Sequence, residues 1–151
     1  MARLKQEYLQ TIHNDAATMN VLIADDVSVI RKMIVNALAK FDVDSYDAAC
    51  DGREAIRLLQ DNAYHLIVTD WNMPGFSGLE VAKEARFRGC NGPIIMQTTE
   101  SQKENVMLAL KAGVTDYIIK PFTMNALEKK LEQHVYHAAM LPTHALVGKR
   151  G

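Results

Sequence analysis

Short runs of mostly apolar residues alternate with longer amphipathic stretches between about residues 20 and 135. Each run stops abruptly at polar residues, which is typical of buried strands in a parallel sheet. The stretches between them carry apolar residues three and four positions apart, the spacing of one face of a helix. This alternation predicts a doubly wound α/β domain with five strand–helix units. The predicted strands lie at 21–24, 44–49 (a weak one), 65–69, 93–97 and 116–119.

Local signals place the helices between these strands. We expect Ser28 to cap the first helix, and the second and third to begin near Gly52 and Ser77. Residues 101–104 (Ser-Gln-Lys-Glu) have the spacing of a capping box, and the helix that they open should stop at Gly113. The last helix carries its apolar residues on one stripe: Met124, Leu127, Leu131 and Val135.

Composition narrows the function classes. The formal net charge of -1 gives no basic field that would attract nucleic acid, and no apolar run is long enough to span a membrane. The first residues lack the apolar core of a secretory signal. Cys50 and Cys90 are isolated, which disfavours a disulfide framework or a thiolate zinc site and suits a reducing cytosol. We therefore expect a cytoplasmic protein that contacts neither nucleic acid nor membrane.

The β/α pattern sets the expected domain limits. The domain should occupy residues 20–137, preceded by an N-terminal extension at 1–19 and followed by a C-terminal tail at 138–151. The extension has the pattern of a marginal helix, and the tail contains Pro142 and Gly148. No DNA-binding effector domain fits in these remaining residues, so direct control of transcription is not expected.

Five polar residues fall at the carboxyl ends of predicted strands, namely Asp25, Asp26, Asp70, Thr98 and Lys120. Ligands of open parallel sheets bind at this edge. Three carboxylates placed together would repel one another, and a divalent cation removes that conflict. Oxygen ligands without soft donors suit Mg²⁺, with Mn²⁺ as a substitute.

Lys120 and Thr98 extend the prediction from metal binding to phosphoryl chemistry. A phosphoryl group needs its oxygens neutralised on several sides, by the metal, an ammonium and a hydroxyl donor. Taken singly, each residue has an ordinary explanation: helix caps and turns for the aspartates, a cap for Thr98 and a solvated strand end for Lys120. Their coincidence at matching strand ends favours a site that moves a phosphoryl group onto and off an aspartate.

Four segments resemble the receiver domains of two-component response regulators, and most closely the stand-alone chemotaxis members of that family. The resemblance covers about residues 20–135 in register. It implies a flavodoxin-like sheet with strand order 2-1-3-4-5. The matching segments are LIADDVSVIRKMI at 22–34, VTDWNMPGFSGLE at 68–80, PIIMQTTESQKENV at 93–106 and TDYIIKPFTMNALEKKL at 115–131.

The resemblance also implies roles for the site residues. Asp70 would accept the phosphoryl group from a histidine kinase or a small donor such as acetyl phosphate. Asp26 would ligate Mg²⁺ directly, Asp25 mainly through water, and the backbone carbonyl of Asn72 would complete the set. Lys120 would contact a phosphoryl oxygen, and its bond to Pro121 would be cis.

Switching would follow from phosphorylation. Thr98 would move toward the phosphate and let Tyr117 turn inward, which reshapes the surface of the last strand and its two neighbouring helices. A strand-end aromatic such as Tyr117 can equally be a packing residue. Asn72, Thr99 and Glu100 would flank the pocket and influence how water reaches the acyl phosphate, with Thr99 larger than the residue usual there.

The expected partners are a histidine kinase and either a flagellar motor switch protein or a histidine phosphotransfer protein, with a phosphatase as a further candidate. The protein would be a signalling switch that slowly dephosphorylates itself rather than a conventional enzyme. A phosphorelay intermediate or phosphate sink is the alternative within this interpretation.

Three other classes share parts of the pattern. A haloacid-dehalogenase phosphohydrolase needs a titratable carboxylate two residues after its nucleophile, and this chain has Asn72 there. A flavodoxin needs a phosphate-binding loop after the first strand, where Asp25 and Asp26 would repel phosphate. A pseudo-receiver without chemistry would not need the complete acidic set.

His134 and His137 are spaced for one helix face, and we expect both on the surface.

Overall fold

A computed structural model describes residues 19–99 and 103–139. They contain one parallel five-stranded sheet in the order β2-β1-β3-β4-β5, as predicted. The observed starts of β2, β3 and β4 lie one or two residues after the predicted ones. The strands are β1 (Val21–Ala24), β2 (Tyr46–Ala49), β3 (Leu66–Asp70), β4 (Ile94–Thr98) and β5 (Asp116–Ile119).

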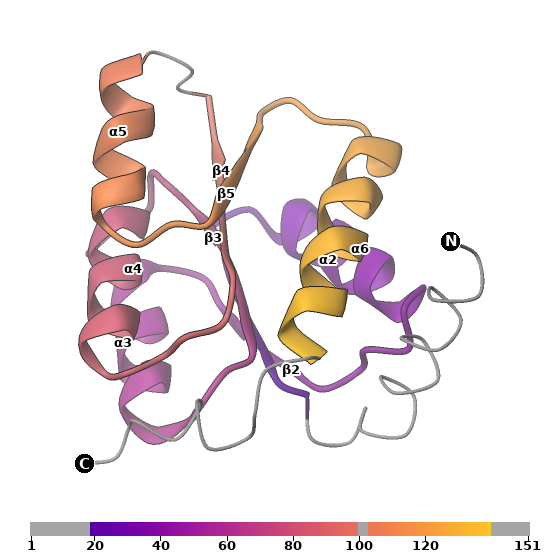
Figure 1. Cartoon of the computed structure of the whole chain (residues 1–151), viewed down its shortest axis with the longest axis horizontal. Coiled ribbons are helices and arrows are strands. Elements are labelled where there is room, and N and C mark those ends of the chain that lie inside the picture. The colour runs from indigo at the N-terminus through magenta and orange to yellow at the C-terminus, as the bar shows by residue number, and fades with distance from the viewer. Residues whose placement is uncertain (1–18, 100–102, 140–151) are drawn as a thin grey trace.

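Helices cover both faces of the sheet. Figure 1 shows α3, α4 and α5 on one side and α2 and α6 on the other, with the sheet seen nearly edge-on between them. This arrangement is that of a doubly wound fold. The helices are α2 (Ser28–Ala39), α3 (Gly52–Asp61), α4 (Gly78–Phe87), α5 (Lys103–Lys111) and α6 (Met124–Ala139).

Each face of the sheet has its own hydrophobic core. One cluster joins α2 and α6 to strand residues such as Ile23, Val68 and Ile118. The other joins α3, α4 and α5 to the alternate strand residues, such as Leu22, Ile67 and Met96. The side-chain alternation along each strand therefore divides the two layers, and both layers hold the sheet rigid behind its carboxyl edge.

Helix starts and ends test the local sequence signals. The helix α4 begins next to Ser77, as predicted, and Ser77 caps it in a complete capping box. The prediction for α2 was wrong, because Val27 is the N-cap and no side chain caps it. The Oδ1 of Asp25 instead accepts from the Val27 N–H at 2.8 Å. Gly113 follows α5 with φ of 99°, the left-handed geometry that favours glycine after a helix.

The expectation for His134 was also wrong. Its side chain is buried against β5, where Nε2 lies 2.8 Å from Asp116 Oδ2. His137 is exposed, as expected. The extension, the tail beyond Ala139 and the capping box at 101–104 involve residues outside the described ranges and stay predictions.

Candidate functional site: an acidic cluster with a lysine

Three aspartates meet at the carboxyl edge of the sheet. Asp25 follows β1 and Asp70 ends β3, and these strands are direct neighbours, with Ala24 opposite Thr69. One carboxylate oxygen from each of Asp25, Asp26 and Asp70 lies within 4.8 Å of the others. Asp25 and Asp70 are buried, whereas Asp26 is exposed. The cluster therefore has a buried base and one side open to solvent.

Lys120 reaches this cluster from the far side of β4. Its backbone N–H donates to Thr98 O at 2.8 Å, which extends the pairing of β4 and β5 beyond β5 itself. Its Nζ lies 3.2 Å from Asp25 Oδ2 and 3.2 Å from Asp70 Oδ2. The bond to Pro121 is cis, as the resemblance implied. The structure thus joins residues 95 positions apart in one ion-pair network.

The environment of Asp70 disfavours its negative charge. Burial raises the pKa of Asp70 above its ordinary value, and the charge of Asp25 raises it further. Lys120 opposes both effects but does not cancel them. One ammonium offsets only one of three carboxylate charges, so the cluster has room for more positive charge.

These features fit a hard divalent cation. The donor set consists of carboxylate oxygens close enough to share one ion, and the exposed Asp26 leaves space for the waters that Mg²⁺ retains. Asn72 lies in the exposed loop after β3, two residues beyond Asp70. The residues present therefore fit Mg²⁺.

Two further residues hold the site and carry no signal that sequence analysis used. Arg31 on α2 donates from its guanidinium to Asp25 O at 2.8 Å. Gly78 lets α4 begin directly against Asp70, because a Cβ there would stand 2.1 Å from Asp70 O. A glycine immediately after the Ser77 cap was the available signal, but only the fold shows what it contacts.

The remaining predicted site residues lie at different depths. Thr98 is buried at the end of β4, and Thr99 beside it is exposed. The side chain of Tyr117 is 36% exposed on β5, so it is turned outward rather than packed in the core. Glu100 is outside the described residues.

A groove of about 410 Å³ adjoins the site on the α2 side. Lys120 connects it to the acidic cluster and Thr99 also lines it, while the rest of its lining is apolar: Val27, Ile30, Pro121 and Phe122. A partner that inserts here would stand next to Asp70.

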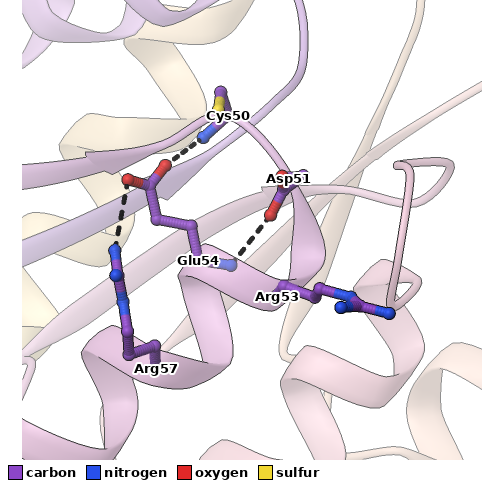
Figure 2. Close-up of a pocket in the computed structure, with 5 residues that line it drawn as sticks. All are labelled: Cys50, Asp51, Arg53, Glu54 and Arg57. Atoms are coloured by element: carbon purple, nitrogen blue, oxygen red, sulfur yellow. Dashed lines mark hydrogen bonds and ion pairs between the residues drawn. The ribbon is translucent and has the colours of Figure 1, made fainter.

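A second hollow, of about 320 Å³, opens at the start of α3 (Figure 2). Its polar groups largely satisfy one another. Asp51 accepts from the Glu54 N–H, while the Glu54 carboxylate accepts from the Cys50 N–H and pairs with Arg57. Arg53 points away from the other four side chains (Figure 2). The Glu54 carboxylate raises the pKa of the Cys50 thiol, so this thiol is a poor nucleophile. We assign no chemistry to this hollow.

Comparison with known proteins decides the family. The model of the response regulator receiver domain matches residues 21–132. The chain belongs to the response regulator receiver domain family. Receiver domains act as phosphorylation switches in two-component signalling and bind Mg²⁺ through an acidic pocket. In this receiver domain, the cluster of Asp25, Asp26 and Asp70 is a set of carboxylates that could hold such an ion.

Several individual relatives of the chain are chemotaxis regulators. A chemotaxis protein CheY homolog of Campylobacter jejuni is 45% identical over 117 residues, which cover 76% of this chain and 90% of the relative. The crystallised CheY4 chemotaxis protein of Vibrio cholerae superposes with a TM-score of 0.69 at 33% identity, covering 77% of this chain and 98% of that one. The receiver domain of a Francisella response regulator gives the same TM-score and identity over 79% and 97%.

Within the described part of this receiver domain, no helix combines the length and apolar content needed to cross a membrane.

Proposed function

We propose that the chain is a chemotaxis-type signalling switch whose phosphate acceptor is Asp70. The observation that carries the proposal is Lys120, whose Nζ lies 3.2 Å from both Asp70 Oδ2 and Asp25 Oδ2. A lysine poised between the acceptor and the metal-binding carboxylates can neutralise phosphoryl oxygens as they arrive. The raised pKa of Asp70 shows that its buried negative charge is not fully balanced, so a further cation is favoured at this place.

In the proposed reaction, a carboxylate oxygen of Asp70 attacks the phosphorus of a phosphohistidine or a small acyl phosphate. The donor's bond to phosphorus breaks, and its electron pair leaves with the donor. Asp25, Asp26, Asp70 and the Asn72 carbonyl would hold Mg²⁺, which neutralises phosphoryl charge when bound. Lys120 would hold one phosphoryl oxygen, and the Thr98 hydroxyl would donate to another.

Water would later reverse the modification. Its oxygen attacks the phosphorus, the bond to Asp70 breaks, and the electron pair returns to the carboxylate as inorganic phosphate leaves. Asn72, Thr99 and Glu100 would govern access of this water. The protein would thus reset itself, and a phosphatase would only accelerate the return.

The apolar groove beside Lys120 suits the phosphate donor. A helix of a histidine kinase or phosphotransfer protein that packed against Ile30 and Phe122 would bring its phosphohistidine to the open side of Asp70. Charged side chains are few in this groove, so binding would depend on apolar contact.

The output surface would lie on α5, β5 and α6. Large apolar side chains remain exposed there, which is typical of a protein-binding surface. Movement of Thr98 and inward rotation of Tyr117 would change the shape of this surface. Because the relatives are named as chemotaxis proteins, we expect a flagellar motor switch protein to bind it. The exposed residues are Met107, Leu108, Leu110, Tyr117 and Ile119.

Intact-mass spectrometry after incubation with Mg²⁺ and acetyl phosphate tests the acceptor. Wild type and the matched control Asp61→Asn, which changes an exposed aspartate at the end of α3, should each gain one phosphoryl group. Asp70→Asn should gain none. An equal adduct on Asp70→Asn, or no adduct on wild type that still binds Mg²⁺ by Trp71 fluorescence, would refute Asp70 as the acceptor.

Partner binding by the phosphorylated protein tests the output. Phosphorylation-dependent binding to a motor switch protein would support the chemotaxis assignment. Transfer of the phosphoryl group to a phosphotransfer protein without motor binding would instead make the chain a relay intermediate or phosphate sink.

A further inference from the structure

One fully buried polar side chain lies next to the acceptor without a role in the switch described above. Gln97 on β4 is 0% exposed. Neither its Nε2 nor its Oε1 has a hydrogen-bond partner among the described residues. A buried amide without partners destabilises the folded state, and an apolar side chain of similar volume would avoid this penalty.

The sheet register places Gln97 between the two charged groups of the site. It is paired with Asp70 on β3 and with Ile118 on β5, two residues before Lys120. Neighbouring strands are about 4.8 Å apart, within reach of a glutamine side chain. Gln97 therefore lies on β4 between Asp70 on β3 and the strand β5 that leads to Lys120.

Alternation along the strands puts these side chains on one face. Val68, Ile95 and Ile118 all belong to the core under α2 and α6. Two positions further along their strands come Asp70, Gln97 and Lys120, which therefore share that face. The face of Gln97 is the one on which the acidic cluster and Lys120 meet.

The chemistry of an amide matches both neighbours. Asp70 offers carboxylate oxygens that accept hydrogen bonds, and Lys120 offers an ammonium with three donors, two of which its known contacts use. Nε2–H can donate to the first while Oε1 accepts from the second. No apolar residue can do either.

We propose that Gln97 is a positioning residue of the phosphoryl site: once Asp70 is phosphorylated, the amide that is unpartnered in this structure bridges Asp70 and Lys120 and shortens the lifetime of the phosphorylated state. This inference rests on the proposed phosphorylation of Asp70. During hydrolysis the bond between phosphorus and the Asp70 oxygen breaks and its electron pair returns to the carboxylate. A hydrogen bond from Gln97 to that carboxylate stabilises the returning charge, and its carbonyl keeps the lysine aligned.

Gln97→Leu tests the proposal because it removes donor and acceptor at similar volume. The variant should have a higher melting temperature without Mg²⁺, since the unpartnered amide is gone. Its phosphorylated form should decay about tenfold more slowly, the effect of one net hydrogen bond. Ile95→Val is the matched control on the same face of β4, and it should change packing but not the decay rate.

A spectroscopic measurement separates positioning from packing. The side-chain amide signals of Gln97, assigned by their loss in Gln97→Leu, should shift when wild type is phosphorylated. Unchanged amide signals together with equal decay rates would overturn the proposal, as would a slower decay reproduced by Ile95→Val. Absence of any adduct on wild type would instead refute the function on which it rests.

Discussion

At the scale of single residues, the environment of Asp70 makes its negative charge unfavourable for the stability of the fold. Asp70 is 7% exposed, and its carboxylate lies next to Asp25. Burial and the neighbouring charge raise its pKa, so the folded protein binds a proton there more readily than the unfolded chain does. Its ionisation therefore destabilises the fold, and the penalty is present at neutral pH and absent below the unfolded pKa near about 4. The same unfavourable negative charge attracts a cation.

Asp70→Asn should accordingly stabilise the metal-free protein at pH 7, by about 1 kcal/mol. The difference should shrink as the pH falls toward about 4, where wild-type Asp70 is protonated. Adding Mg²⁺ should reverse the ranking, because the ion binds the folded wild type more tightly than the variant. Urea unfolding at several pH values, with and without Mg²⁺, measures all three effects. A variant less stable than wild type at pH 7 without metal would contradict the account.

At the scale of elements, Asp116 joins the start of β5 to α6. Its carboxylate accepts from Lys130 Nζ at 2.8 Å and lies 2.8 Å from His134 Nε2. Partial burial alone would raise the pKa of Asp116, but the hydrogen bonds from His134 and Lys130 outweigh this and lower it. The sign is opposite to that of Asp70. This contact contributes stability above the unfolded pKa, and the contribution is lost as the pH falls through the lower, folded pKa.

Asp116→Asn should therefore destabilise the protein at pH 7, by about 1 kcal/mol because the pair keeps contact with water. The loss should shrink as the pH falls through the lowered pKa of Asp116, because the wild-type carboxylate then also becomes neutral. The same urea series measures it, with Asp70→Asn as the variant of opposite sign. Equal stability of Asp116→Asn and wild type at pH 7 would show that the contact contributes nothing.

How much of these elements can be predicted from sequence depends on how far apart along the chain the interacting residues lie. The strands and the start of α4 near Ser77 rest on local patterns, and both were predicted correctly. Ser28 was wrongly assigned as a cap because Val27 is the N-cap of α2, and the Asp25 side chain after β1 holds the Val27 N–H in place. His134 was wrongly placed on the surface because its partner Asp116 lies 18 positions away. Contacts between distant segments become visible only once the sheet order is known.

The candidate site shows the same limit. The aspartates and Lys120 were predicted because parallel strand ends share one edge of the sheet. Gln97 and Gly78 were not, since their importance lies in what stands beside them. An amide next to a carboxylate and a glycine against a carbonyl carry no signature along the chain.

At the scale of the whole molecule, the two edges of the sheet differ in how they are held. At the amino edge, Arg86 on α4 donates to the carbonyl oxygens of Cys90, Gly92 and Gly113, which ties α4 to the segments before β4 and β5. At the carboxyl edge, the corresponding place holds the ion pairs of Lys120 with Asp25 and Asp70, which would rearrange under the proposed phosphorylation. A switch built this way should move at one edge and stay fixed at the other, with β4 and β5 carrying the change to the exposed surface.

Thr98→Ala tests this coupling because it leaves Asp70, Lys120 and the acidic cluster in place. The variant should still gain a phosphoryl group, while phosphorylation should no longer alter hydrogen exchange in β5 and α6. Wild type should show that change, with little change around Arg86 and the amino edge. Thr115→Ala is the matched control, because it removes a threonine hydroxyl that binds the Ile94 N–H at the amino edge, far from the switch. It should lose stability but keep the response. If Thr98→Ala responds like wild type, the signal reaches the output surface by a route that does not involve this hydroxyl.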